Sequence, residues 1–272
     1  MKYFLGTYRM INVLSLDVAA GAMICASFFA RLMEVAILPQ GLISLGLTVW
    51  VIYTADHLLD AKKLNQTAAT ERHRFHQRHF NVLLGMMILA IGVDATQIYF
   101  IRKVVFFSGL WLSLLVAVYF LIQQRLGFMK ELLGSLLYTG GVLLIPLSAK
   151  GYIPGPFILP VLQFGMVAWI NLLLFSMIDQ RRDEKDGHQS FATTFGQAVT
   201  GRVLLFLFIL LAILSIIQLS LFPINPLATL ILTLMSIFLL FIFLEKNYFE
   251  REDRYRLLGD AVFMLPFIYL LF

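Results

Sequence analysis

The stretch IDQRRDEKDGHQSFATTFG, residues 178–196, sets a dense run of charge directly after a long apolar segment. From Asp179 to Asp186 every residue except Gln180 is charged, although the chain of 272 residues is 60% hydrophobic and only 14% charged. Soluble domains contain about 25% charged residues, enough to cover their surface. The composition therefore predicts a membrane protein with several spans, and the charge run marks a point where the chain leaves the lipid.

Apolar runs of about 20 residues, the length that crosses the core of a bilayer, recur along the whole chain. We predict an all-α polytopic membrane protein in which residues 1–272 form a single transmembrane domain, a bundle around a central cavity. The nine expected spans are residues 11–30, 36–55, 81–101, 104–122, 132–149, 157–178, 203–222, 227–244 and 257–272.

Basic residues gather in alternate loops. If the N-terminus is cytoplasmic, 17 of the 21 lysines and arginines lie in the cytoplasmic segments, which are 1–10, 56–80, 123–131, 179–202 and 245–256. This bias follows the positive-inside rule and predicts a cytoplasmic N-terminus and an external C-terminus, in a plasma (inner) membrane. The net charge of +5 then suits anionic membrane lipid or a phosphorylated substrate rather than nucleic acid, and no protein partner is inferred.

Two pairs of carboxylates close the second and sixth predicted spans. Asp56 and Asp60 form the first pair, Asp179 and Asp183 form the second, and each pair has i, i+4 spacing. Residues with this spacing share one face of a helix. Four carboxylates at one membrane face repel one another, and a divalent cation removes that cost. Oxygen ligands with open coordination positions suit Mg²⁺, so the four acids are predicted to be a catalytic Mg²⁺ site.

Basic residues stand near both pairs and could bind the oxygens of a diphosphate. The alternative is that these charges are solvated helix ends that anchor the protein at the membrane surface. The candidate diphosphate-binding residues are Lys62, Lys63, Arg72, Arg181, Arg182 and Lys185.

With these motifs the chain resembles the UbiA superfamily of intramembrane prenyltransferases, which have nine transmembrane helices and Asp-rich motifs on the second and sixth. The second motif of that family is D-x-x-x-D-x-x-x-G, followed by Ser or Thr and a closing Gly. The resemblance implies Mg²⁺-dependent transfer of a prenyl group from an isoprenoid diphosphate to an aromatic or lipid acceptor within the membrane. The matching residues are Asp179, Asp183, Gly187, Ser190 and Gly196.

The first motif departs from the family pattern N-D-x-x-D-x-x-x-D. Aligning Asp56 and Asp60 with its last two acids leaves Ile52 and Tyr53 where Asn and Asp belong. Aligning Asp56 with the first acid instead leaves Leu59 and Lys63 at the later two positions. We prefer the first alignment because it keeps two carboxylates. Either alignment lacks at least one expected metal ligand, which indicates a divergent branch of the family.

Prenyl transfer needs an apolar cavity that excludes water, and aromatic faces can stabilise the allylic cation. Asn12 and Asp17 on the first span, with Tyr53 and Tyr138, are expected to line that cavity. Lipid-facing or packed positions are the alternative for any aromatic residue in a membrane protein. The other candidate aromatics are Phe28, Phe29, Trp50 and Trp169.

Two further intramembrane acids and a histidine-rich loop have simpler interpretations. Asp260 is expected to pair with Arg254 or Arg256, and Asp94 to form a hydrogen bond between helices. The loop ERHRFHQRHF, residues 71–80, holds three histidines whose i, i+3, i+6 spacing drifts around a helix. That spacing makes a poor zinc triad, so the loop is expected to be a basic interfacial helix or a lid over the diphosphate.

Two other functions compete with the enzyme. A non-catalytic relative could bind or move a polyprenyl-phosphate lipid, as the incomplete first motif suggests. A secondary transporter could use Asp17, Asp94 and Asp260 as a proton relay. Convergence of the four paired acids on one cavity would favour the enzyme.

Overall fold

The computed structural model describes residues 2–63, 67, 70–123, 125–221 and 225–272, which form helices joined by short turns, with no strand among them. Among these described residues, seven helices are long and apolar enough to cross a membrane. They are α3 (Pro39–Lys63), α5 (Phe80–Gln97), α6 (Lys103–Ile122), α7 (Lys130–Lys150), α8 (Ile158–Asp186), α9 (Phe191–Leu221) and α10 (Pro226–Leu244). The shorter α-helices are α1 (Lys2–Val13), α2 (Leu16–Leu32), α4 (Glu71–Arg78), α11 (Lys246–Phe249), α12 (Arg254–Ala261) and α13 (Phe267–Leu270). Short 3₁₀ turns are η1 (Gly127–Met129), η2 (Gly155–Phe157), η3 (Arg251–Asp253) and η4 (Val262–Met264).

The all-α bundle is confirmed, but the predicted count of nine spans is not. The first predicted span, 11–30, bends by 78° where α1 meets α2, and counting that bent pair as one span gives at most eight in the described part of the chain. Ser15 makes the bend with a left-handed backbone, φ 56°. The last predicted span, 257–272, is divided among α12, η4 and α13. Pro266 stands directly before α13 and has no amide hydrogen to continue a helix.

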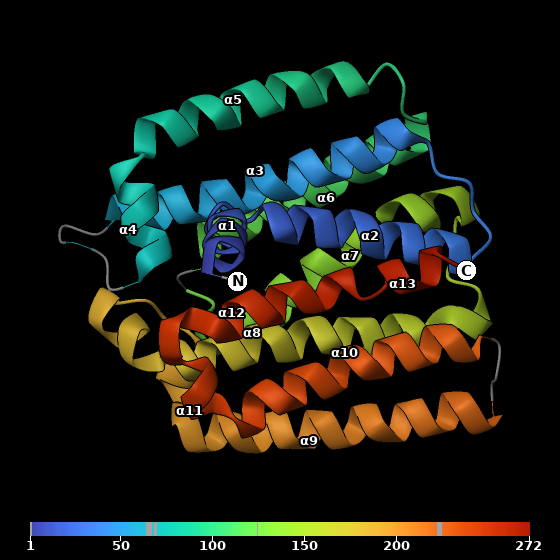
Figure 1. Cartoon of the computed structure of the whole chain (residues 1–272). Helices are drawn as coiled ribbons and strands as arrows, with labels where there is room; N and C mark the ends of the chain where they lie inside the picture. Colours follow the sequence, from blue (N-terminus) through green and yellow to red (C-terminus); the bar gives the residue numbers. More distant parts are fainter. Residues whose placement is uncertain (1, 64–66, 68–69, 124, 222–224) are drawn as a thin grey trace.

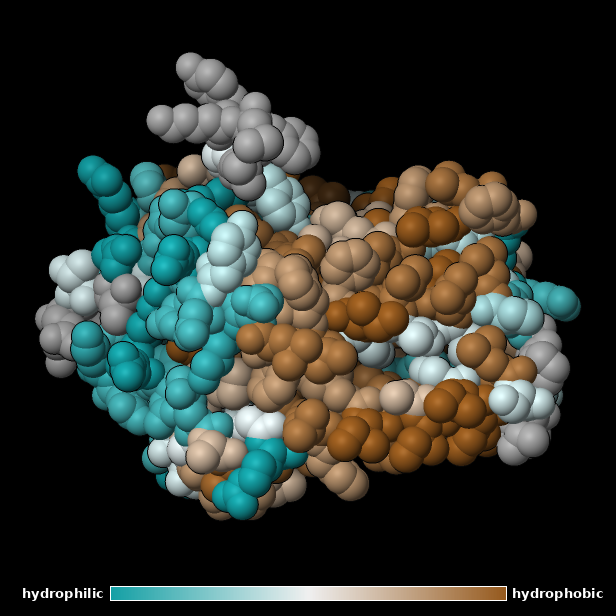
Figure 2. All heavy atoms as spheres, turned by 60° about the horizontal axis from the view of Figure 1, so that its bottom comes forward, coloured by the Kyte–Doolittle hydropathy of each residue, from teal (hydrophilic) through white to brown (hydrophobic). Residues whose placement is uncertain are grey.

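The surface shows how the bundle sits in lipid. A broad hydrophobic band covers the side of the bundle, and hydrophilic residues gather mainly at one end of it (Figure 2). Helices α5 and α6 leave most of their apolar side chains exposed, among them Leu89 and Trp111, which are 68% and 69% exposed. A soluble protein rarely exposes so large an apolar surface. The chain is therefore a multi-pass membrane protein.

Helices α2 and α8 occupy the middle of the bundle. Figure 1 shows α2 between α3 and α12, with α8 beside α10, and α9 on the far side. Aromatic side chains fill the contact between these helices, since Phe28, Phe29 and Phe164 are fully buried and pack edge to face. Helices α3, α5, α6, α7 and α8 surround a separate space on the other side of this packing.

The two ends of the bundle differ in what they contain. One end, here called the polar end, holds α4, α11 and the turn between α8 and α9 (Figure 1). Helix α1 crosses the bundle near its polar half, and the C-terminal residues after α13 lie at the opposite end. Helix α8 has 29 residues and is about 43 Å long, so its last turns extend beyond an apolar core of about 30 Å.

Candidate active site

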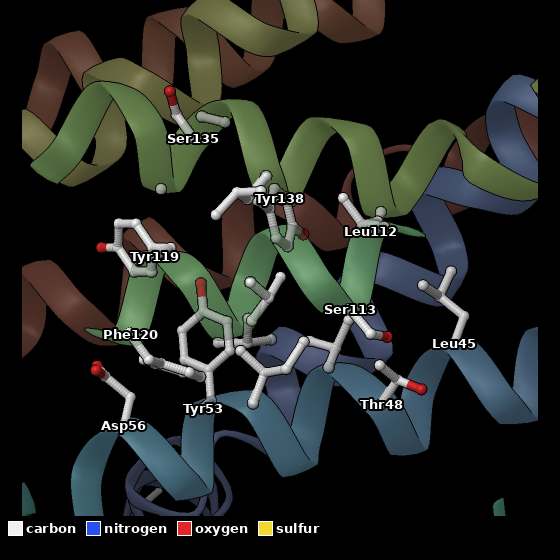
Figure 3. A pocket seen from close by; sticks show the side chains of 18 of the residues that line it. Leu45, Thr48, Tyr53, Asp56, Leu112, Ser113, Tyr119, Phe120, Ser135 and Tyr138 are labelled. Atoms are coloured by element: carbon white, nitrogen blue, oxygen red, sulfur yellow. The ribbon is translucent and has the colours of Figure 1, made fainter. Parts of the chain in front are cut away.

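A cavity of about 740 Å³ lies between α3, α5, α6, α7 and α8. Its polar lining is contributed largely by residues near the polar end, whereas much of the rest is apolar, including Ile91, Ile98 and Val105. Figure 3 shows Tyr53 and Asp56 pointing from α3 toward Tyr119 of α6 across this space. A cavity with this division can hold a molecule that has a charged head and an apolar chain.

All four paired acids line this one cavity: Asp56, Asp60, Asp179 and Asp183. Helix α3 carries one pair and α8 carries the other, each near the helix end at the polar end of the bundle. The i, i+4 spacing turns both members of each pair to the same side. The structure thus brings together two motifs that are more than 100 residues apart, although their role in metal binding stays a prediction.

The spacing of the second motif follows from how α8 ends and α9 begins. Gly187 ends α8 with a left-handed backbone, φ 72°, and the next amide donates to the carbonyl of Asp183 over 2.8 Å. Ser190 and Thr193 then exchange hydrogen bonds between their amides and hydroxyls, which starts α9. Gly196, with φ 81°, makes a kink inside α9. Gly187, Ser190 and Gly196 therefore shape the part of the chain that follows the acids.

Asp179 is held by groups from the C-terminal part of the chain, which the sequence did not indicate. Arg256 Nη2 and the Tyr255 hydroxyl each donate to its carboxylate over 2.5 Å. Arg182 Nη1 adds a third contact of 3.3 Å. The guanidinium of Arg256 also lies 5.3 Å from the ring centroid of Phe175. The expected partner of Arg256, Asp260, is not its ion-pair partner.

Lys130 and Glu131 are two charged cavity residues that the sequence analysis missed. Both lie at the start of α7 and line the cavity. Glu131 Oε1 accepts from the amide of Phe191 over 2.9 Å and so fixes the start of α9. Lys130 places a cation in the same cavity as Asp56 and Asp183. Their position after a short turn gave no pattern that could have distinguished them from ordinary helix-end charges.

Most of the predicted diphosphate-binding cations lie outside the cavity. Among those with described side chains, only Arg72 lines the cavity, and the side chain of Lys63 lies outside the described residues. Arg182 pairs with Asp253 as well as with Asp179. The cations that come two residues after a paired acid point to a different side of the helix from that acid, and none of them lines the cavity. Three of the predicted cations are exposed and do not line the cavity: Lys62, Arg181 and Lys185.

Arg72 belongs to a buried polar cluster that joins α1, α2, α4 and α12. Its Nη2 donates to Asn12 Oδ1 over 2.9 Å and lies 3.5 Å from Asp260 Oδ2. The Asn12 amide donates to Asp17 over 2.6 Å and to Asp260 over 2.8 Å. Two expectations are corrected here. Asn12 and Asp17 do not line the cavity but lie in this cluster, and Asp260 pairs with Arg72 rather than Arg254 or Arg256.

The aromatic lining also differs from the prediction. Tyr53 and Tyr138 line the cavity as expected. The other four candidates do not: Phe28, Phe29 and Trp50 are buried in the core, and Trp169 packs against it. Aromatic residues that line the cavity without having been expected are Phe106, Tyr119, Phe120, Phe175 and Phe263.

Histidines gather at the polar end. His57 of α3 lies 4.9 Å from His76 and 5.9 Å from His73, both of α4, measured between ring centroids. Burial lowers the pKa of His73 to about 3, although the nearby Asp60 carboxylate raises it, and burial also lowers the pKa of His76. Both rings are therefore neutral at pH 7. His79 is exposed, so the three histidines of this segment do not converge.

Asp94 forms the expected hydrogen bond between helices. The hydroxyl of Thr48 on α3 donates to its Oδ2 over 2.9 Å. Asp94 also lines the cavity, whereas Asp17 lies in the cluster around Asn12. The three intramembrane acids are thus bound in two separate hydrogen-bonded groups.

Comparison with known proteins identifies relatives of the same fold. A UbiA homologue from Archaeoglobus fulgidus bound to DMAPP and Mg²⁺ is 14% identical, with a TM-score of 0.63 over 96% of this chain and 98% of that chain. The structure bound to GPP and Mg²⁺ matches equally, over 99% of that chain. An apo UbiA homologue from Aeropyrum pernix K1 is 13% identical, with a TM-score of 0.64 over 96% and 98%.

No match was found among curated proteins. The model of the UbiA prenyltransferase family matches residues 56–265, which include all four cavity acids and begin just after Ile52 and Tyr53. That stretch covers well over half of the chain. The chain therefore belongs to the UbiA prenyltransferase family.

Proposed function

We propose that this protein transfers a prenyl group from an isoprenoid diphosphate to a hydrophobic acceptor within the membrane, with Mg²⁺ as cofactor. One observation carries the proposal: two pairs of carboxylates from α3 and α8 line a single cavity that continues into apolar space. The Archaeoglobus fulgidus homologue, which has the same fold, was solved with DMAPP or GPP and Mg²⁺. Both ligands combine a diphosphate with an apolar chain.

The donor set fits Mg²⁺, which prefers oxygen ligands and often joins a few carboxylates to substrate phosphates. Asp56, Asp60 and Asp183 would hold the ion together with Asp179. The carboxylate of Asp179 already accepts three contacts, from Arg256, Tyr255 and Arg182, and a carboxylate offers about four lone-pair sites. Bound Mg²⁺ would supply neutralisation of the leaving diphosphate.

Two cations of the chain itself would add to that neutralisation. Lys130 and Arg256 line the cavity beside the acids and can each donate to diphosphate oxygens. Arg72 also lines the cavity but is held by Asn12 and Asp260, so its part is to keep α4 in place rather than to bind freely. Charges fixed in advance stabilise a leaving group without reorganisation.

The apolar part of the cavity suits the prenyl chain and the acceptor. As the bond between C1 and the diphosphate oxygen breaks, the diphosphate leaves with the electron pair. The acceptor then bonds to C1 and loses a proton. The faces of Tyr53 and Tyr138 line the cavity and would stabilise the positive charge on the allyl group. The enclosing helices exclude water, which would otherwise capture the cation.

Residues 1–272 would form one such domain, in a plasma (inner) membrane with a cytoplasmic N-terminus and an external C-terminus. The four cavity acids would then face the cytoplasm, where prenyl diphosphates are available. Support for this orientation comes from the bias of lysine and arginine toward the segments at the polar end.

The test is an assay of the purified protein with Mg²⁺, radiolabelled prenyl diphosphates of several lengths and a membrane-lipid extract as acceptor. Release of diphosphate together with a labelled lipid product is expected. Alanine at Asp56, Asp60, Asp179 or Asp183 is expected to lower turnover to background. The matched control is Glu184→Gln, which should leave turnover unchanged. Glu184 is an exposed acid on α8, the helix of Asp179 and Asp183. Full activity with all four acids replaced would refute the proposed site.

A second function is non-catalytic binding of a polyprenyl-phosphate lipid. Ile52 and Tyr53 favour it, because they replace the Asn and Asp of the first motif. Binding of prenyl diphosphate without release of diphosphate, for every acceptor offered, would favour it. Absence of any binding in the presence of Mg²⁺ would exclude both functions.

A further inference from the structure

A cluster of three potential metal ligands lies at the polar end and contains none of the four paired acids. His73 comes from α4, Asp186 is the last residue of α8, and His188 lies in the turn between α8 and α9. One ligand atom of each side chain lies within 4.8 Å of the other two. In tetrahedral zinc sites the ligand atoms are about 3.3 Å apart, given bonds of about 2.0–2.1 Å. Small side-chain rotations would bring the three ligand atoms to this spacing.

The local structure turns these side chains toward one another. The left-handed Gly187 stands between Asp186 and His188, and this tight reversal sends both side chains to the same side of the turn. On the other side of the cluster, the hydroxyl of Thr70 caps α4 by accepting from the amide of His73 over 3.3 Å. The ring centroids of His73 and His188 are 5.6 Å apart.

One nitrogen of each imidazole ring is buried. His73 Nδ1 and His188 Nε2 are buried without a hydrogen bond within the part of the chain that the structure describes. Buried polar atoms normally have a partner, so two such atoms in neighbouring rings point to a missing ligand. Both residues also line the cavity, which leaves a fourth coordination position open on that side.

We propose that His73, Asp186 and His188 bind a zinc-type divalent cation that fastens α4 to the turn between α8 and α9. Two imidazoles and one carboxylate favour Zn²⁺ or a similar transition metal, whereas Mg²⁺ prefers oxygen ligands alone. The ion would link two segments that are joined to different halves of the bundle and that flank the same cavity. Its effect is to hold these two segments together beside the polar end of the cavity.

This site shares no ligand with the proposed Mg²⁺ site, although His73 and His188 line the same cavity, and it does not depend on prenyl transfer. Asp186 is not among the residues that line the cavity, and none of the four paired acids belongs to the cluster. If the protein does not bind zinc but does catalyse Mg²⁺-dependent prenyl transfer, the zinc site is refuted and the proposed function is not.

The first test is a zinc titration of the purified full chain, freed of metal with EDTA, against a chromophoric chelator in millimolar MgCl₂. One Zn²⁺ per chain is expected, and excess Mg²⁺ should not displace it. His73→Ala, Asp186→Asn and His188→Ala should each weaken binding at least about tenfold. His79→Ala is the matched control, because His79 is exposed at the end of the same segment, and it should bind as the wild type does.

The second test asks whether the ion fastens the two segments. Amide hydrogen exchange in Glu71–Arg78 and in residues 187–190 should slow on addition of Zn²⁺ in the wild type and not in His188→Ala. Since His188 lies in a turn, its replacement should leave the unfolding temperature in EDTA unchanged, which separates loss of metal from loss of fold. Zinc binding that is equal in the wild type and in all three variants would overturn the proposal.

Discussion

Arg256 Nη2 lies 2.5 Å from Asp179 Oδ2, an ion pair between residues 77 positions apart. The Asp179 side chain is only 3% exposed and that of Arg256 is 20% exposed, so water does little to screen the pair. Through this contact the C-terminal segment becomes part of the acidic cavity. The second acidic motif is therefore completed by residues that lie far outside it.

Replacing Arg256 with alanine should destabilise the protein by about 3 kcal/mol, because it leaves the buried carboxylate of Asp179 without its main cation. Arg256→Lys should restore part of the loss. The free energy of unfolding, measured in mixed micelles with increasing denaturing detergent, checks this. Arg254→Ala is the control, since Arg254 pairs with the exposed Glu252 and its loss should cost less than about 1 kcal/mol. Equal effects of the two alanine variants would contradict the assignment.

Lys130→Ala should weaken the binding of a prenyl diphosphate about tenfold to a hundredfold. A hydrogen bond to a charged group contributes about 1.5–3 kcal/mol, and Lys130 is a cavity cation beside the acids. Equilibrium binding of a non-hydrolysable prenyl diphosphate analogue in the presence of Mg²⁺ measures the change. Lys185→Ala, an exposed lysine of α8, should bind like the wild type. A loss of similar size at Lys185 would mean that general surface charge, not the cavity, attracts the ligand.

The double variant Ile52→Asn with Tyr53→Asp should lower the Mg²⁺ concentration that gives half-maximal turnover. Both positions line the cavity on the same helix as Asp56, so the new oxygen ligands would extend the proposed site. A steady-state titration of Mg²⁺ at saturating prenyl diphosphate checks this. Tyr53→Phe alone serves as the control for loss of the hydroxyl. An unchanged or higher Mg²⁺ requirement in the double variant would show that the first motif is not a reduced form of the family's metal site.

Cysteines introduced at Thr67 and Gln189 should react with a membrane-impermeant thiol reagent from the same side, and a cysteine at Tyr152 from the other. All three positions are exposed, and the native Cys25 is fully buried and should stay unlabelled. Labelling of sealed vesicles of known orientation provides the measurement. Opposite-side labelling of Thr67→Cys and Gln189→Cys would refute the predicted topology.

The second acidic motif could be predicted from sequence because its chemistry is local. Its acids, its two glycines and Ser190 act on a single helix end and the turn that follows it, so their spacing contains most of the geometry. The apolar spans could be predicted for the same reason, since the length of an apolar run sets whether a helix crosses lipid. The helical membrane bundle follows from these two signals.

The remaining features depend on contacts between distant segments, and local patterns do not report these. Arg256 and Lys130 looked like ordinary charges at helix ends until the fold placed them in the cavity. Asp260 was assigned to its nearest arginines in sequence, yet it turns inward to Arg72 and Asn12. The last span was expected to be continuous because hydropathy averages over Pro266, which interrupts the helix in the structure.

The cluster around Asn12 sets an order for the biogenesis of this chain. Asn12 binds Asp260, its partner 248 positions later, so the first helix can complete its hydrogen bonds only after Asp260 has been synthesised. Until then the buried guanidinium of Arg72 has no carboxylate from α12 to pair with. A chain that stops before Asp260 leaves Asn12 and Arg72 without this partner inside an apolar bundle, which costs free energy in lipid.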